Sequence, residues 1–411
     1  MPGYVLDLEK FHATGSWSAA VSPADRNKYP LSLIGKTWFP PLTARLNNMR
    51  ALPVTGQQFA ALLELSPALP THFNWADNTN TPKKAKINSV QNQGQCGSCW
   101  AVSSASAIGD QWAVATGKAA VMLSPFGICK CACNQWNKSG TAAAASCTSK
   151  CDGDQCENCD NGGWPYDAGV TAATIGLVSN TCWPYDDSQC SLSSPPANQC
   201  TALTCPRWYV NPSSIRQGFV RKDGQTNVAT TSIDQVDVPA SLDLIRRHIY
   251  QFGPVVIGFQ VPSDFENYTS GVWRSNVGDS VGGHAVVITG WGYDAQNKLY
   301  WVVRNSWGTG WGTGGYFRVY AYDSAYPKNN LGFDIPMFPQ DSGASGAISG
   351  WGGAVLWNVD TQRSPKSTLS VSALTLSSDA KKDIFFALVG VIVVGTIVGW
   401  LLMRYNESDQ R

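Results

Sequence analysis

The chain has 411 residues, which is enough for one large domain or two smaller ones with appendages. Charged residues make up only 14% of it and the formal net charge is +1, so we expect neither a basic surface for nucleic acid nor an acidic solvating tail. The apolar fraction of 43% supports a sizeable core, while 39 glycines and 13 cysteines favour a loop-rich, cross-linked body over a helical bundle.

Residues 1–68 contain no cysteine, and they combine short capped helical pieces with an extended stretch, WFPPLTARL. This pattern predicts an N-terminal arm rather than an independent domain. The first residues, MPGYVLDLEKFHATG, have no apolar run and carry acidic side chains, so no secretory signal is predicted there.

The stretch QNQGQCGSCWAVSSASA places Cys96 and Cys99 three positions apart. This spacing fits a redox pair, half of a zinc site, or a structural cysteine beside a reactive one. Residues 97–116 contain few helix breakers and predict a buried helix, whose N-terminus would favour the thiolate of Cys99. Gln93 lies just upstream, where its amide can donate to an oxyanion together with the backbone N–H of Cys99.

All thirteen cysteines lie between Cys96 and Cys205, a density typical of disulfide-stapled domains in oxidising compartments. The odd number leaves one thiol over, which is either reactive or buried and inert. Cys129, Cys131 and Cys133 also admit a zinc site, but their spacing is irregular and no histidine lies near them. We therefore expect no metal and no other cofactor.

Farther along the chain, residues 241–252 carry an apolar stripe and predict a second helix. His248 lies on this helix beside Arg246 and Arg247, and we expect it to face solvent. Four β-rich runs then follow between glycines, namely PVVIGFQV, HAVVITGWGY, LYWVVRNSW and GYFRVYAY. Helices in the first half and strands in the second predict an α+β body with two lobes.

One histidine stands out among the four in the chain. His284 follows two glycines at the start of a predicted strand, from which its ring can project into a cleft. Asn305, in RNSWGTGWG, can accept from one ring N–H and fix the tautomer, and Trp307 can shield that bond from water. The alternatives are a structural histidine, a turn amide and a core aromatic.

The C-terminal part changes composition twice. Residues 340–383 are rich in Ser, Gly and Thr and predict a flexible linker. Residues 384–403 hold no charge and, at about 1.5 Å per residue, would span a bilayer core as a transmembrane helix. A buried core helix is the alternative for this segment. Residues 404–411 would form a short tail.

Taken together, QGQCGSCWA, GGHAVVITGWG and RNSWGTGWGTGGYF resemble the papain family of cysteine proteases over roughly residues 69–337. The resemblance implies a papain-like two-lobed fold, with a helical left lobe, a β-barrel-like right lobe and an active-site cleft between them. It implies that Cys99 is the nucleophile, His284 the general base and acid, Asn305 its orienting partner and Gln93 an oxyanion donor. The protease domain would cover residues 69–339.

The same resemblance implies further contacts around the cleft. Cys96 would pair with Cys159, in CDNGG. Gly162, Gly163 and Trp307 would line the substrate cleft, where glycines allow close approach of a peptide backbone.

Within the family, GLVSNTCWPYDDSQC and PSDFENYTSGVW look most like cathepsin B. That likeness implies an occluding loop closed by a Cys190–Cys200 disulfide. The loop here lacks the histidine pair that holds a substrate's C-terminal carboxylate, so endopeptidase action is favoured over dipeptide removal. A catalytically inactive homologue that serves as a binding module is the alternative function.

The resemblance also implies the partners of the protein, while the expected disulfides and the apolar segment 384–403 imply its setting. Residues 1–68 would be a propeptide that inhibits the zymogen, and protein or peptide substrates and cystatin-like inhibitors would be partners. Residues 384–403 would anchor the protease domain in a lumenal or extracellular position, in a lysosome-like or other endomembrane compartment. The sequons at Asn137 and Asn267 would then be glycosylated.

Overall fold

The computed structural model of the 411-residue chain describes the following residues: 18–19, 68–77, 85–131, 162–163, 165–190, 199–218, 237–262, 265–273, 280–321 and 353–365. Most of the expected propeptide and the proposed membrane segment 384–403 lie outside them, as do the tail 404–411 and Cys159. No helix within the described ranges combines the length and the apolar character needed to cross a membrane.

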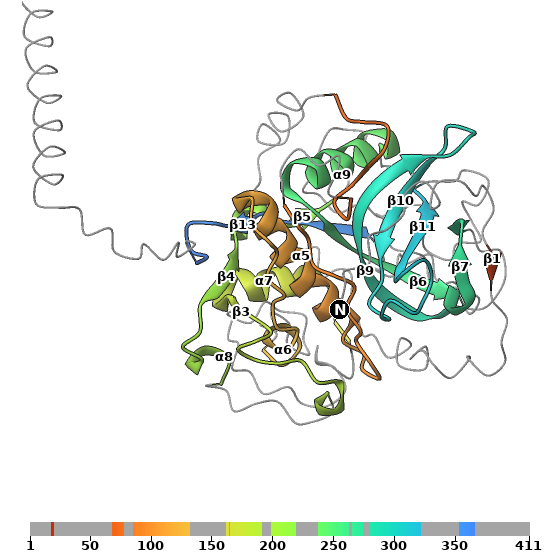
Figure 1. The fold of residues 1–411 in the computed structure, drawn as a ribbon. Coiled ribbons are helices and arrows are strands. Elements are labelled where there is room, and N and C mark those ends of the chain that lie inside the picture. The colour runs from red at the N-terminus through yellow and green to blue at the C-terminus, as the bar shows by residue number, and fades with distance from the viewer. Residues whose placement is uncertain are drawn as a thin grey trace, which may run out of the picture. The chain divides into compact units, whose positions relative to one another are not determined.

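Helices and a small sheet form one side of the body (Figure 1). The helices are α5 (Cys99–Thr116), α6 (Phe126–Cys129), α7 (Pro165–Ile175) and α8 (Gln199–Ala202), with short 3₁₀ turns η1 (Asp187–Gln189) and η2 (Pro212–Ser214). The small sheet has the order β13 (Val359–Asp360), β4 (Arg207–Val210) and β3 (Leu177–Val178).

Helix α5 confirms the helix predicted over residues 97–116. It ends where Gly117 takes a left-handed conformation (φ 71°) and donates its N–H to Ala113, a common glycine stop. The helix is buried along nearly its whole length, and its many small side chains let neighbouring elements approach closely. A Cβ at Gly109, for example, would come within 1.9 Å of the Val121 carbonyl oxygen.

A larger sheet forms the other side. Its strands run in the order β5 (Arg216–Gln217), β12 (Gly353–Leu356), β6 (Val255–Pro262), β9 (Ser280–Tyr293), β10 (Leu299–Arg304), β11 (Tyr316–Tyr320) and β8 (Val272–Trp273), and β2 (Phe73–Asn74) also pairs with β9. The turn η4 (Phe265–Asn267) leads into β7 (Tyr268–Ser270), which pairs with β1 (Ser18–Ala19). The four predicted β-rich runs correspond to β6, β9, β10 and β11.

Helix α9 (Val238–Phe252) packs against this sheet and confirms the second predicted helix. It begins three residues earlier than residue 241 because Asp237 caps it, accepting from the Ala240 N–H at 3.0 Å. It ends at Gly253, whose N–H bonds to Ile249. The prediction that His248 faces solvent is wrong: it is 2% exposed, and its Nε2 lies 3.1 Å from the Trp357 carbonyl oxygen.

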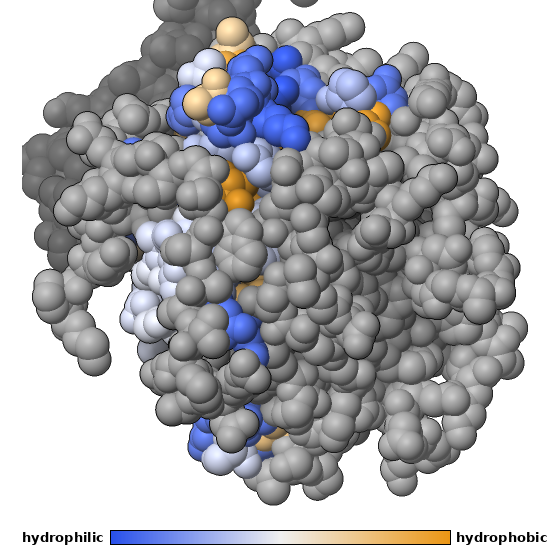
Figure 2. Space-filling model, turned by 90° about the vertical axis from the view of Figure 1, so that its right-hand side faces the viewer, coloured by the Kyte–Doolittle hydropathy of each residue, from blue (hydrophilic) through white to orange (hydrophobic). Residues whose placement is uncertain are grey.

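Two large clusters of buried side chains accompany the two sides. One contains residues of the large sheet and α9, such as Ile249 and Val286, and the other contains residues of α5, α7 and β4, such as Trp100 and Trp208. The face shown in Figure 2 carries mainly hydrophilic side chains among its coloured residues, with only small apolar areas. The separation of the two buried clusters fits the predicted α+β architecture, with helices and strands on separate sides.

One predicted boundary is wrong. The expected linker 340–383 includes residues 353–365, which belong to the folded body because β12 joins the large sheet and β13 joins the small one. Leu356 and Trp357 have no exposed surface. The prediction relied on the Ser/Gly-rich composition of the whole stretch and overlooked a short apolar run, AVLW. Burial of this run holds the segment against the two sheets.

Candidate active site

Cys99 is the first residue of α5 and is buried. It is the free cysteine among the cysteines in the described ranges. Backbone groups of Ala285 on β9, and of Trp100 and Cys99 at the helix start, act on its sulfur and lower the pKa of the thiol. These groups stabilise negative charge on sulfur, and the Ala285 contact places the thiol beside the residue that follows His284.

The antiparallel register of β9 and β10 brings His284 and Asn305 together. Arg304, the last residue of β10, pairs with Val287, so the next residue along comes level with Val286, two positions from His284 on the same strand face. The Nε2 of His284 lies 2.8 Å from the Oδ1 of Asn305.

The hydrogen bonds of Asn305 define the tautomer of His284. The Asn305 Oδ1 also accepts the Ser306 N–H at 2.8 Å. Because this oxygen can only accept, Nε2 of His284 donates, which leaves Nδ1 as the basic nitrogen of the neutral ring. A base with this tautomer can take a proton from a thiol.

Trp307 lies over the imidazole of His284, with ring centroids 4.9 Å apart and planes at 25°. It also belongs to an aromatic cluster with Phe265 and Trp311. Trp307 therefore fills both roles considered from the sequence, a core aromatic and a cover for the histidine. With Asn305 only 2% exposed, the His284–Asn305 bond is kept away from water.

Burial opposes charge on both reacting groups. It raises the pKa of Cys99 to about 11, against the backbone N–H bonds that lower it. It lowers the pKa of His284 to about 4, against the bond to Asn305 that raises it. Neither group ionises readily alone, whereas transfer of the thiol proton to the imidazole creates two opposite charges that attract each other.

Gln93 lies in the loop before α5, and its side chain is fixed at both ends. Its Oε1 accepts from the Ser306 hydroxyl at 2.6 Å, and its Nε2 donates to the Cys96 carbonyl oxygen at 2.9 Å. Its backbone N–H donates to the Ser306 carbonyl at 2.8 Å. The amide carries two N–H groups, and this bond uses one of them.

The structure gives a different reason for glycine at each of the two predicted cleft positions. Gly163 packs on the indole of Trp100, the neighbour of Cys99, and a Cβ there would come within 2.5 Å of that ring. This contact brings Gly163 beside the site and excludes any larger residue. Gly162 has φ 78°, in the left-handed region that favours glycine.

The disulfides differ from those that the resemblance implied. Cys96 is bonded to Cys190, not to Cys159, and Cys200 is bonded to Cys131, so Cys190 and Cys200 do not close a loop between them. The physical reason is that the segment 185–190 packs directly on the loop before α5, where Asp187 accepts the Gln95 N–H at 2.9 Å. A third bond joins Cys182 and Cys205.

These disulfides also bear on two alternatives from the sequence, a redox pair and a zinc site. Cys96 is in a disulfide while Cys99 is free, so the two do not form a redox pair. Cys129 and Cys131 are both disulfide-bonded, so neither sulfur is a thiolate that could bind zinc.

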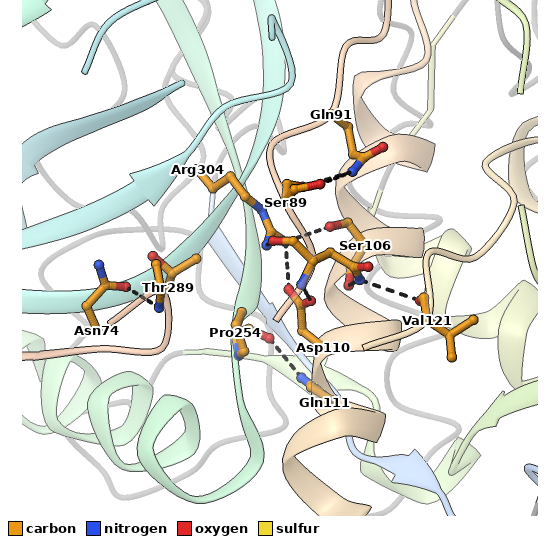
Figure 3. Close-up of polar contacts among 12 residues, drawn as sticks. Asn74, Ser89, Gln91, Ser106, Asp110, Gln111, Val121, Pro254, Thr289 and Arg304 are labelled. Atoms are coloured by element: carbon orange, nitrogen blue, oxygen red, sulfur yellow. Dashed lines mark hydrogen bonds and ion pairs between the residues drawn. The ribbon is translucent and has the colours of Figure 1, made fainter. Parts of the chain in front are cut away.

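A buried ion pair connects the two elements that carry the site (Figure 3). Arg304, adjacent to Asn305, donates to Asp110 of α5 at 2.6 Å and to the Ser106 hydroxyl at 2.6 Å. It also donates to the Asn88 carbonyl, while the Asn88 N–H donates to Asp110. Burial raises the pKa of Asp110, and the attraction of Arg304 opposes this rise. The pair therefore fixes the helix of Cys99 relative to the strand that ends at Asn305.

Several residues around the site escaped the sequence interpretation. Ser306, Tyr185 and Ala285 contact Gln93 or Cys99 directly. Ser306 could have been noticed because it lies inside the RNSWG motif. Tyr185 could not, because only the fold brings it to a loop some ninety positions earlier in the chain.

Comparison with known proteins points the same way as this geometry. A family model described as papain family cysteine protease matches residues 69–331. The chain is 30% identical over 299 residues to cathepsin B-like cysteine proteinase 5 of Caenorhabditis elegans, covering 68% of this chain and 77% of that protein. It is 34% identical over 241 residues to cathepsin B-like cysteine proteinase 1 of Haemonchus contortus, covering 56% and 63%.

Solved structures show the same fold. The structure of proCathepsin B S9 from Trypanosoma congolense superposes with a TM-score of 0.50 at 22% identity, covering 87% of this chain and 97% of that one. Procathepsin L2 from Tenebrio molitor larval midgut superposes with a TM-score of 0.51 at 21% identity, covering 85% and 89%.

Proposed function

The chain belongs to the papain family of cysteine proteases, with cathepsin B-like relatives, and from this premise we propose that it is an endopeptidase that works through a Cys99 thiolate and a His284 imidazolium. One observation carries the proposal: the buried His284 donates through Nε2 to Asn305, while the backbone of the next residue, Ala285, lowers the pKa of the Cys99 thiol. In this tautomer Nδ1 is the basic nitrogen of the ring, which in the proposed mechanism takes the thiol proton.

The proposed reaction has two halves. In the first, His284 takes the Cys99 proton and the sulfur attacks the peptide carbonyl carbon, while the amide of Gln93 and the backbone N–H of Cys99 stabilise the oxyanion. His284 then protonates the leaving amine, which gives a thioester. In the second half, water loses a proton to His284 and attacks the thioester. The acid product leaves, and the proton returns to sulfur.

Endopeptidase action is supported by the segment between Cys190 and Cys200. This segment contains no histidine that could hold a substrate's C-terminal carboxylate. Cys190 and Cys200 are bonded to other cysteines, so a disulfide of its own does not close the segment. The sequence of this segment therefore offers no imidazole for a terminal carboxylate, which favours cleavage inside longer chains over dipeptide removal.

Inhibition by the chain's own N-terminal residues is supported by one contact. Ser18 and Ala19 add a short strand to the edge of β7, opposite Ser270 and Tyr268. Strand addition is a common way to hold an extended segment on a protein surface. We infer that residues 1–68 act as a propeptide, as in the proenzyme structures that share this fold.

Membrane anchoring through residues 384–403 remains our proposal, supported by their length and lack of charge. The three disulfides among the described residues support a lumenal or extracellular protease domain. Alkaline carbonate extraction should release a chain that ends at residue 365 and leave the full chain in the membrane pellet.

Glycosylation tests the lumenal or extracellular position separately. Endoglycosidase treatment should shift the mass of the full chain but not of the double variant Asn137→Gln and Asn267→Gln.

The catalytic proposal is tested with a long internally quenched peptide that is blocked at both ends. Wild-type protein should cleave it internally, and mass spectrometry should locate the cut between interior residues. Cys99→Ala should lose turnover by several orders of magnitude. An epoxide or vinyl sulfone reagent should label Cys99 in the wild type. Turnover by Cys99→Ala, or release of terminal dipeptides only from unblocked peptides, would overturn the proposal.

A further inference from the structure

The loop before α5 is held by a second segment, residues 185–190. The Tyr185 hydroxyl lies 2.8 Å from the Gln93 carbonyl oxygen and 2.5 Å from the Ser98 hydroxyl. Farther along, Asp187 accepts the Gln95 N–H, and Cys190 is bonded to Cys96. The segment therefore touches the loop at successive points between Gln93 and the start of the helix.

The hydrogen bonds of Tyr185 have a defined direction. The Gln93 carbonyl only accepts, so the single O–H of Tyr185 donates to it, and the Ser98 hydroxyl must donate to the Tyr185 oxygen. Burial raises the pKa of Tyr185, so the phenol stays protonated and remains a donor at neutral pH. The chain of bonds thus runs from Ser98 through Tyr185 to Gln93.

This arrangement also affects the helix start. Ser98 is the N-cap residue of α5, but its side chain makes no capping bond. Its hydroxyl instead bonds to Tyr185. The backbone of Trp100, whose N–H a capping side chain could otherwise bond, instead lowers the pKa of Cys99.

We propose that Tyr185 is a positioning residue that fixes the Gln93 backbone so that the Gln93 amide meets the oxyanion. The inference rests on the proposed function, because it assigns Tyr185 to the loop that carries the proposed donor. Tyr185 supports the main chain of Gln93, while Ser306 and the Cys96 carbonyl hold its side chain. Both supports are needed to aim a donor accurately at developing charge.

The test compares Tyr185→Phe with Tyr250→Phe in the full chain. Tyr250 lies on α9, where its ring contacts Phe73 at 5.1 Å, and we expect its variant to behave as wild type. Tyr185→Phe should lower kcat about tenfold. It should also weaken the binding of a peptide aldehyde about tenfold, because the hemithioacetal adduct places its oxygen where the oxyanion forms. The KM and the rate of Cys99 alkylation by iodoacetamide should stay unchanged.

Two more variants separate the possible failures. Gln93→Ala should weaken the aldehyde at least as much as Tyr185→Phe; if it does not, the proposed oxyanion role of Gln93 is wrong. If Gln93→Ala weakens the aldehyde and Tyr185→Phe matches the control, the positioning role is wrong. Asp187→Asn should reproduce the Tyr185→Phe pattern to a smaller degree. A rise in KM together with slower alkylation in Tyr185→Phe would mean general loop disorder and would also overturn the inference.

Discussion

Cys99 and His284 are both buried and lie on different elements, and the proposed mechanism links their protonation. Burial raises the pKa of Cys99 to about 11, so an isolated thiol there would hold little thiolate at neutral pH. In the proposed mechanism His284 accepts this proton, so that the thiolate forms as half of an ion pair.

His284→Gln should therefore change the pH dependence of alkylation by iodoacetamide. In the variant, the thiolate fraction depends on Cys99 alone, so the rate should rise with pH up to about 11. The wild type should already react at neutral pH. The measurement is the alkylation rate against pH, with alkylation of Cys99→Ala as the blank. Identical profiles for variant and wild type would show that His284 does not share the thiol proton.

At this scale the sequence predicts the reacting residues better than their supports. Cys99, His284 and Asn305 lie in short motifs whose chemistry is local. The partner of Cys96 depends instead on which segment packs against its loop, and the 185–190 segment reaches that place only through the fold. The same reason hides Tyr185, whose neighbours in the chain suggest nothing about Gln93.

At the scale of elements, the position of α5 relative to β10 must stay fixed, because Cys99 is the first residue of α5 and Asn305 directly follows β10. The Arg304–Asp110 pair joins them, with side chains 2% and 0% exposed. Periodicity and helix breakers predicted the helix and the strands, and the structure confirms them. The sequence did not predict the ion pair between them. A buried charge pair leaves no periodic signal, and only the packing of α5 on the sheet brings the two residues together.

Asp110→Asn should destabilise the protein by about 3 kcal/mol, because it leaves the Arg304 guanidinium buried without its charge partner. The lost cross-link should also lower kcat. Urea unfolding gives the first quantity and peptide turnover the second. Asp243→Asn is the control, since Asp243 pairs with Arg246 and Arg247 on the surface of α9, where its side chain is 31% exposed. Equal losses for the two variants would contradict the prediction.

At the scale of the whole protease body, residues 353–365 connect its two sides. Strand β12 lies between β5 and β6 in the large sheet, and β13 follows at once in the small sheet against β4. Trp357, between the two strands, is fully buried and packs near Gly169 of α7. Composition alone predicted a linker here, since the pairing partners lie far away in the sequence.

A chain that ends at residue 365 should therefore fold and cleave peptides, whereas one that ends at residue 352 should not. The shorter chain loses β12 and β13, exposes the edges of β6 and β4, and leaves an empty space where Trp357 packs. Trp357→Ala in the full chain should cost about 3–5 kcal/mol for the same cavity. Thermal unfolding followed by circular dichroism and turnover of the quenched peptide measure both effects. If the 352-residue chain melts and cleaves like the 365-residue chain, the connection between the two sheets contributes nothing to the active site, and the lobes hold their geometry through α5 and its contacts alone.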